Sequence, residues 1–453
     1  MISAMLTKTN PSSTTMPTTA IKQPQPSASL VPPDVAARER DALLHGWPVR
    51  LRLTRKRSLG LGEQPRVSLG GTRDHHGVAA GALRDGHGVG AASHVAVAHD
   101  GHAHGLLHPR DSAPLGAPEI EAYVEDLSLQ IRRKAKEGEL GAVETVYLGG
   151  GTPSHVGLAG LSMLLYTLSL SMHLTDEVEC TMEANPESLT ERMVRDIWAL
   201  GVNRLSIGVQ SFDDDVLRTL GRAHSSDDAR RAIEAARTRF ENVSVDLMCG
   251  IPGQSAESFE ASAREAVRLG ATHVSVYPLT VEPHTPFDAA VLAGELEEPD
   301  DDVEAAHMQI AARVLDSEGF ERYEVASYAR PGFACRHNIA YWTGVPYLGL
   351  GRSAATMTQN AQRRMRVKDG QVTDDLDSRQ MVAEDLMLGM RMTAGVSDEH
   401  AARAAELLPE ATTVLADLER QGLVEHEGGR WRPTERGWLC GNELYGALFD
   451  LAD

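Results

Sequence analysis

Beyond about residue 118, apolar and polar positions follow two alternating periods. Short runs rich in Val, Ile and Tyr predict strands, and stretches with apolar residues three or four positions apart predict amphipathic helices. The predicted strands are VETVYLGGG, EVECTMEANP, VNRLSIGVQSF, VSVDLMCGIPGQ, HVSVYPLTVEP and RYEVASYA. The predicted helices are PEIEAYVEDLSLQIRRKAKEG, LAGLSMLLYTLSLSMHL, TERMVRDIWALG, SSDDARRAIEAARTRF, SAESFEASAREAVRLG and EAAHMQIAARVLDSEG.

Alternation of strands and helices predicts an α/β fold, with parallel strands joined by crossover helices in a sheet or barrel. In such folds the chemistry lies at the carboxyl ends of the strands. Here those ends read GGGTP, EANPE, GVQSF, GIPGQ and TVEPHTP. All five are polar or rich in glycine, so we expect them to line one shared mouth.

The C-terminal part, from about residue 371 to 453, has the pattern of a small, mainly helical domain. The stretch AARAAELLPEATTVLADLERQGLVEHEGGRWRPTERGWLC predicts a winged-helix-like arrangement, with GRWRPTERG as the wing. DNA binding is the alternative use of such a domain, but the segment is acidic and DNA binding requires basic surface. We therefore expect a packing domain that shapes or covers the mouth of a barrel spanning residues 118–370.

The N-terminal part has a different composition. Residues 1–33 contain no Asp, Glu or Arg and are rich in Ser, Thr and Pro, which predicts a disordered leader over residues 1–46. Residues 47–117 are dominated by Gly, Ala, His and Arg, without a sustained period. Three interpretations remain open for this second segment: out-of-frame reading of a GC-rich gene, a flexible linker, or a His-rich metal tract without fixed ligand spacing.

Composition narrows the class of protein. The chain has 453 residues and a formal charge of −20, which argues against a nucleic-acid surface. No apolar run approaches the roughly 20 residues of a membrane span. The four cysteines are scattered, with no CxxC pair, which is typical of the reducing cytoplasm. We expect a cytoplasmic protein without a transmembrane segment; its oligomeric state stays open.

The ordered set of strand ends resembles the radical S-adenosylmethionine superfamily. YLGGGTPS, EANPESLT, RLSIGVQSFDDDVLRTLGRAH, VDLMCGIPGQS and VYPLTVEPHTPF follow one another as in its oxygen-independent coproporphyrinogen oxidase-like branch. RHNIAYW with YLGLGRSAATM, and the C-terminal EDLMLGMRMTAGVS and ERGWLCGNELYGAL, resemble the heme chaperones of that branch more closely. The resemblance covers residues 118–450. It implies a partial (β/α) barrel of the radical S-adenosylmethionine type, with S-adenosylmethionine, heme and a [4Fe–4S] cluster as the family's cofactors.

The resemblance also implies which residues meet S-adenosylmethionine. Gly150 and Gly151 lack side chains, so their backbone carbonyls can accept from the cofactor's ammonium, and Thr152 adds a hydroxyl. Glu183 is a carboxylate at the mouth that would meet the cofactor's polar groups. Gln210 offers an amide that can donate to and accept from ribose hydroxyls.

Two further residues complete this expected site. Arg222 has a guanidinium fork that suits the methionyl carboxylate, although an arginine at a helix start is also common on surfaces. Asp246 lies between Val and Leu within VDLMCG, and a buried carboxylate must have partners. The resemblance makes that partner the cofactor.

Heme contacts are expected from RHNIAYW. His337 is a candidate axial ligand for heme iron, and Tyr341, four residues later, is a candidate ring contact. The alternative for His337 is a hydrogen-bonded histidine in a loop after RPGFAC. Cys335 is a less favoured soft ligand.

The cluster ligands of the family have no counterpart. Members bind [4Fe–4S] through CxxxCxxC at the end of a first strand, whereas this chain has no cysteine before Cys180, and that strand is missing with them. We therefore assign no cluster ligands and no catalytic residues, and whether the chain is an enzyme stays open. The preferred function is a heme chaperone that binds heme and S-adenosylmethionine and delivers heme to receiving proteins. The alternatives are oxygen-independent coproporphyrinogen III oxidation and a non-catalytic barrel remnant.

Overall fold

A twelve-stranded sheet with five consecutive parallel strands forms the centre of the fold. The structure, a computed structural model, describes residues 3–8, 117–140, 142–150, 153–283 and 285–452. The parallel strands are β2 (Ala142–Gly149), β3 (His173–Ala184), β4 (Arg204–Gln210), β5 (Asn242–Cys249) and β6 (His273–Pro278). They are neighbours in chain order, so the predicted α/β fold with parallel strands is confirmed.

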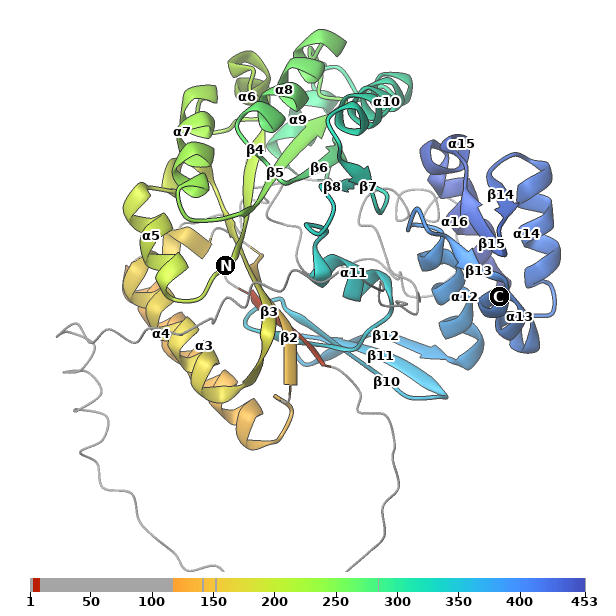
Figure 1. Cartoon of the computed structure of the whole chain (residues 1–453), viewed down its shortest axis with the longest axis horizontal. Coiled ribbons are helices and arrows are strands. Elements are labelled where there is room, and N and C mark those ends of the chain that lie inside the picture. The colour runs from red at the N-terminus through yellow and green to blue at the C-terminus, as the bar shows by residue number, and fades with distance from the viewer. Residues whose placement is uncertain (1–2, 9–116, 141, 151–152, 284, 453) are drawn as a thin grey trace, which may run out of the picture. The chain divides into compact units, whose positions relative to one another are not determined.

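Helices that precede, join and follow these strands cover one face of the sheet (Figure 1). They are α3 (Ala117–Lys136), α4 (Gly157–Ser171), α5 (Glu191–Ala199), α6 (Asp214–Thr219), α7 (Ser226–Arg237), α8 (Ala256–Arg268), α9 (Pro286–Leu292) and α10 (Asp301–Ser317). Alternate strand residues such as Val146, Ile207 and Val245 pack against apolar helix residues such as Leu164 and Ile233 in the main core. Removing this apolar surface from water is the main force that holds helices on the sheet.

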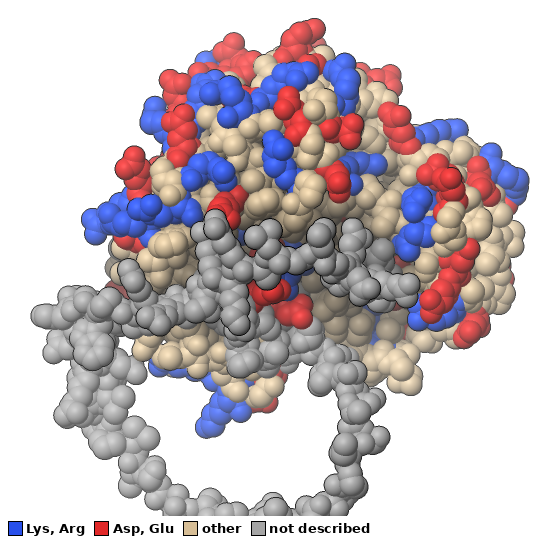
Figure 2. Space-filling view, in the orientation of Figure 1, with Lys and Arg blue, Asp and Glu red and all other residues tan. Residues whose placement is uncertain are grey.

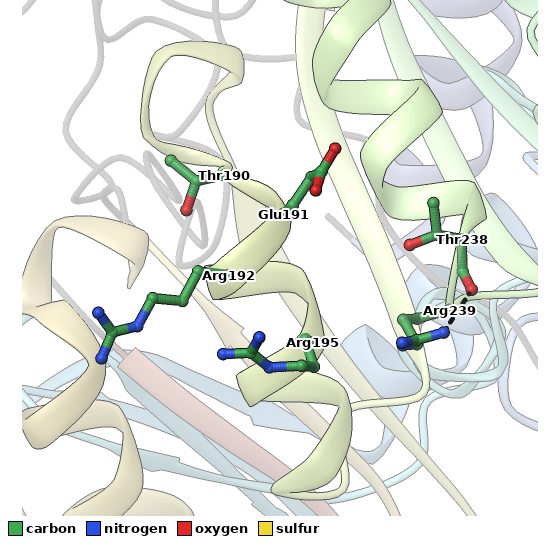
Figure 3. Close-up of a pocket in the computed structure, with 6 residues that line it drawn as sticks. All are labelled: Thr190, Glu191, Arg192, Arg195, Thr238 and Arg239. Atoms are coloured by element: carbon green, nitrogen blue, oxygen red, sulfur yellow. Dashed lines mark hydrogen bonds between the residues drawn. The ribbon is translucent and has the colours of Figure 1, made fainter.

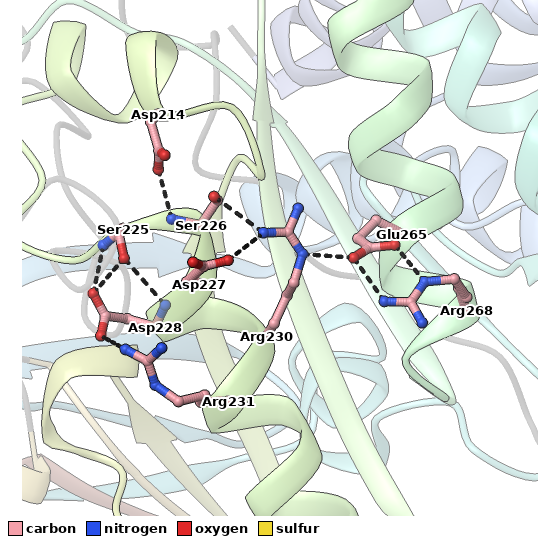
Figure 4. A network of polar contacts seen from close by, with 9 residues as sticks. All are labelled: Asp214, Ser225, Ser226, Asp227, Asp228, Arg230, Arg231, Glu265 and Arg268. Carbon is pink, nitrogen blue, oxygen red and sulfur yellow. Dashed lines mark hydrogen bonds and ion pairs between the residues drawn. The ribbon is translucent and has the colours of Figure 1, made fainter.

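Polar contacts join helices α7 and α8. Ser225 caps the N-terminus of α7 by accepting from the Asp228 backbone N–H. Arg230 of α7 pairs with Glu265 of α8, which also contacts Arg268 (Figure 4). Because these side chains are partly or largely exposed, such pairs contribute little stability each. The visible face in Figure 2 carries positive and negative side chains interspersed over the described residues.

Two ends of the parallel region differ from expectation. Strand β1 (Ser3–Lys8) occupies the position beside β2, where we expected the family's first strand to be missing. It runs antiparallel to β2 and to β9 (Tyr347–Leu350). Pairing covers the open edge that β2 would otherwise present. RYEVASYA is not one parallel strand: it forms β7 (Glu321–Arg322) and β8 (Ser327–Ala329), and β8 is antiparallel to β6. The rest of the expected leader and the segment to residue 116 lie outside the described residues.

The sheet continues beyond β1 and β9 as antiparallel strands. These are β10 (Ala355–Gln359), β11 (Arg363–Lys368) and β12 (Gln371–Asp377). Strand β12 pairs with β11, so the sheet extends past the expected domain boundary at residue 370. Helix α11 (Arg336–Trp342) lies on the inner side of the curved sheet, opposite the covering helices (Figure 1).

The C-terminal region is mainly helical with a small sheet. Its elements are α12 (Ser378–Gly389), β13 (Val396–Ser397), α13 (Asp398–Leu407), α14 (Ala411–Arg420), β14 (Val424–Glu427), β15 (Arg430–Pro433), α15 (Glu435–Leu439) and α16 (Gly441–Phe449). The order helix, strand, two helices and hairpin is that of a winged helix, and β14–β15 is the wing. Trp438 donates its indole N–H to the Val325 carbonyl, 2.8 Å away, next to β8. None of the helices in the described part of the chain is long and apolar enough to span a membrane.

Candidate ligand site at the strand ends

The inner face of the parallel strands is polar. Residues that alternate with the outer apolar positions contact one another across the interior: Tyr147 with Glu183, Ser206 with Asp246, and Ser244 with His273. The buried polar residues of this face are Thr145, Glu179, Thr181, Glu183, Arg204, Ser206, Ser244, Asp246, His273 and Ser275. Because successive strand residues point to opposite faces, one alternation produces both the apolar outside and this polar inside.

Glu183 and the first glycines form a tight cradle at the end of β2 and β3. The Glu183 carboxylate accepts from the Tyr147 hydroxyl at 2.8 Å and from the Gly150 backbone N–H at 3.2 Å. A Cβ added to Gly149 would lie 2.7 Å from Tyr147 Cε1 and 2.8 Å from Glu183 Cδ, so a larger residue there would displace one of these side chains. Burial raises the pKa of Glu183 to about 8, an effect that the Tyr147 hydrogen bond reduces and nearby Asp246 reinforces. Gly151 and Thr152 lie outside the described residues.

Gln210 ends β4 in an unusual state. Its φ angle is 66°, a left-handed conformation that is rare for residues other than glycine. The side chain is 1% exposed, yet neither amide atom has a hydrogen-bond partner among the described residues. A Cβ at Gly208 would lie 2.9 Å from its Nε2 atom and 3.3 Å from Asn185 Oδ1, which places the amide beside the end of β3. A buried amide without partners costs free energy, and such groups are rare in folded proteins.

Asp246 has the partners that its burial requires, and the cofactor contact that the resemblance implies stays a prediction. Its carboxylate accepts from the hydroxyls of Ser206, at 3.0 Å, and Ser244, at 3.3 Å. Burial raises the pKa of Asp246 to about 6, whereas buried Arg204 and the serine hydroxyls oppose that rise. Asp246 is close enough to Glu183 to raise its pKa, so both carboxyls share one interior.

Arg222 follows β4 and lies close to Glu187, just after β3. Burial lowers the pKa of Arg222 to about 10, and the attraction of Glu187 opposes this. His224 is held between the Val209 carbonyl and the same Glu187 carboxylate. The connections after β3 and β4 therefore meet at this edge of the sheet, as expected for the carboxyl ends of neighbouring parallel strands.

RHNIAYW forms helix α11 instead of a loop. Glu179 of β3 accepts from the backbone N–H groups of Arg336 and His337, both at 3.0 Å, which satisfies the free donors at the helix start. His337 is 1% exposed, and its Nδ1 lies 2.9 Å from Thr145 Oγ1. Its ring stacks on Tyr147 with 4.8 Å between centroids, while Tyr341 meets it edge-on at 5.0 Å.

The uncharged ring of His337 is the form that can bind a metal, although the side chain is buried. Burial and then Arg204 lower the pKa of His337 to about 3, so the ring is neutral at physiological pH. Its Nε2 atom has no hydrogen-bond partner among the described residues. A neutral imidazole with a free nitrogen is the form that ligates iron. Cys335, the less favoured ligand, donates its thiol to Glu179 instead.

A separate surface cavity of about 530 Å³ lies outside this interior. It is lined by Thr190, Glu191, Arg192, Arg195, Thr238 and Arg239, none of which is a predicted site residue (Figure 3). Arg192 and Arg195 both pair with Asp196. The cavity is therefore a distinct, partly neutralised surface feature.

Comparison with known proteins decides the family. Residues 116–266 match the Radical SAM superfamily, and residues 376–440 match the HemN C-terminal domain. The chain is 33% identical over 353 residues to the heme chaperone HemW of Bacillus subtilis (strain 168), covering 73% of this chain and 91% of that protein. The chain belongs to the HemW family.

A second relative agrees with membership of the HemW family, and a solved structure agrees with the fold. The heme chaperone HemW of Mycobacterium tuberculosis (strain ATCC 25618 / H37Rv) is 34% identical over 350 residues, which cover 74% of this chain and 88% of that protein. The solved structure of coproporphyrinogen III oxidase (HemN) from Escherichia coli superposes with a TM-score of 0.62 at 20% identity, over 74% of this chain and 84% of that one. The second similarity supports the fold alone.

Cys180 and Cys335 of this HemW family member do not fit the cluster that its superfamily implies. Cys180 packs in the apolar core on the outer face of β3, and Cys335 lies at the start of α11. Burial raises the pKa of both thiols to about 12, whereas cluster ligands are thiolates. Within the described ranges, no group of three or more His, Cys, Asp or Glu side chains is placed to hold a metal ion. The absence of cluster ligands stays a prediction from the sequence.

The sequence analysis did not identify several buried polar residues that surround the predicted site residues. Tyr147, Glu179, Arg204 and His273 are buried on the inner face, yet none was selected as a candidate. The signal was present as a period of two within single strands, for example Glu, Thr and Glu in ECTMEA. Polar residues at every second position of strands covered by helices on one side indicate a polar interior.

Proposed function

We propose that the strand ends of this HemW family member bind S-adenosylmethionine. The observation that supports this most strongly is Gln210: a buried amide with both polar atoms unpartnered in the described structure, on a strained backbone. Strained and unsatisfied groups persist where function requires them. Ribose hydroxyls can both accept from and donate to such an amide.

The other residues of the cradle suit the remaining polar groups of S-adenosylmethionine. Glu183 is mainly protonated at neutral pH, because burial raises its pKa. An arriving ammonium would favour the ionised carboxylate and would pair with it, assisted by Gly150 and by Gly151 and Thr152, which follow in the sequence. Arg222 would bind the methionyl carboxylate. Asp246, which accepts hydrogen bonds from Ser206 and Ser244, would act indirectly: its charge raises the pKa of Glu183.

Calorimetric titration with S-adenosylmethionine tests this proposal. We expect Gln210→Ala to weaken binding about tenfold or more, the effect of two lost hydrogen bonds, without lowering the urea midpoint of the free protein. Stability should persist because the amide has no protein partner in the described chain. Arg239→Ala, in the cavity of Figure 3, is the matched control and should bind normally. Loss of affinity in the control alone would move the site to that cavity.

We also propose heme as the cargo, with His337 as its iron ligand and Tyr341 beside the porphyrin. The neutral ring supports this assignment, as does its Nε2 atom, which has no partner among the residues that the structure describes. Because His337 is 1% exposed, binding would require α11 to move away from Tyr147. Heme-receiving proteins would then be the partners, in the cytoplasm.

Hemin titration followed in the Soret region tests the heme assignment. The wild-type chain should give a Soret band that weakens in His337→Ala. His426→Ala is the control, since His426, on strand β14 of the wing, pairs with Asp398 of α13. An unchanged spectrum in His337→Ala would remove the assignment. Because Cys180 and Cys335 do not fit a cluster, a binding protein is favoured over an oxidase.

A further inference from the structure

Tyr147 contacts both proposed sites with different parts of one side chain. Its hydroxyl donates to the Glu183 carboxylate at 2.8 Å. Its ring stacks on His337 with 4.8 Å between centroids and 23° between planes. The side chain is 7% exposed, so it has little freedom to move without disturbing one contact or the other.

His337 is held from several sides in the same place. Thr145 of β2 contacts its Nδ1, Tyr341 packs on its edge, and Glu179 fixes the start of its helix. Thr145 and Tyr147 are alternate residues of one strand and face the same interior. Release of His337 therefore requires the ring to leave Tyr147, the residue that also orients Glu183.

We propose that Tyr147 is a positioning residue shared by the two sites, so that a ligand on Glu183 holds His337 in its buried position. This inference rests on the proposed function. A cationic ligand favours ionised Glu183, and a carboxylate accepts a stronger hydrogen bond from the Tyr147 hydroxyl than a carboxylic acid does. The ring beneath His337 is then held more firmly. By linkage, hemin on His337 weakens S-adenosylmethionine binding by the same factor.

The first test needs no ligand. Diethyl pyrocarbonate modifies accessible neutral imidazoles, so its rate at His337, followed by peptide mass spectrometry, reports release of the ring. Tyr147→Phe keeps the stacking and removes the hydroxyl, whereas Tyr147→Leu removes both. Tyr328→Phe is the matched control, because the buried Tyr328 hydroxyl has no hydrogen-bond partner in the described structure.

We expect the rate to rise about fivefold in Tyr147→Phe, the effect of one buried hydrogen bond, and further in Tyr147→Leu. Tyr328→Phe should match the wild type. The proposal would be overturned if His337 in Tyr147→Phe were modified at a rate within twofold of the rates in the wild type and in Tyr328→Phe. This comparison holds even if Tyr147→Leu fails to fold.

The second test repeats the modification with S-adenosylmethionine present, at a concentration that calorimetry shows to be saturating. Modification of His337 should slow about fivefold in the wild type and stay unchanged in Tyr147→Phe. Equal slowing in both proteins would show that the ligand acts without the hydroxyl and would overturn the proposal. If calorimetry shows no binding to the wild type, the proposed function fails, while the ligand-free rates still decide whether Tyr147 restrains His337.

Discussion

Replacing Glu183 by Gln should change how the stability of the protein depends on pH. In the folded protein, burial raises the pKa of Glu183 from 4.5 to about 8. The folded state therefore holds this proton more tightly than the unfolded chain, and its contribution to stability is fully present below pH 4.5. It is lost progressively as the pH rises to about 8.

The size of this loss follows from the burial of Glu183, which is 6% exposed. At about 1.4 kcal/mol per pKa unit, the difference between 4.5 and about 8 corresponds to at most about 5 kcal/mol. Gln cannot ionise, so Glu183→Gln should lack this loss. At pH 5 the variant should be slightly less stable than the wild type, by about 1 kcal/mol for one imperfect hydrogen bond to Tyr147 or Gly150. At pH 9 it should be more stable by several kcal/mol.

Urea unfolding, followed by tryptophan fluorescence between pH 5 and pH 9, measures the difference. Some pH dependence should remain in the variant, because the pKa of Asp246 is also raised, to about 6. Glu121→Gln, on the exposed surface of α3, is the control and should follow the wild type at each pH. A constant difference between Glu183→Gln and the wild type across this range would refute a buried, protonated Glu183.

Four further substitutions probe the packing around the site and its link to the C-terminal region. Gly149→Ala should lower the thermal midpoint and weaken S-adenosylmethionine binding, since its Cβ would lie 2.8 Å from Glu183 Cδ; normal binding would contradict the cradle. Glu384→Ala should reduce the free energy of unfolding by about 3 kcal/mol, because it removes a carboxylate shared by two buried arginines of β11. Asp375→Ala, which breaks an exposed pair on the same hairpin, should cost less than about 1 kcal/mol in the same urea titration. Trp438→Phe should cost about 1 kcal/mol by losing its indole hydrogen bond, and unchanged urea unfolding would show that this contact does not stabilise the protein.

The sequence alone identified the parallel strands β2 to β6, most of the helices that cover them, and their order. Periodicity identified the parallel strands and covering helices, and the polar strand ends pointed to one edge of the sheet, where Gly150, Glu183 and Gln210 do lie. These predictions succeed because the period of apolar residues reports which face of a helix or strand is buried. The same periodicity could not show that RYEVASYA turns back antiparallel, because strand direction depends on where the connecting chain leads.

Tertiary structure decided which polar residues are already satisfied and which are not. Asp246 has serine partners, Gln210 has none among the described residues, and His337 lies buried in a helix inside the sheet. The bond from Glu179 to the His337 backbone joins positions 158 residues apart. Local patterns carry no information about such pairs, since the folded chain brings them together only when the sheet curves around α11.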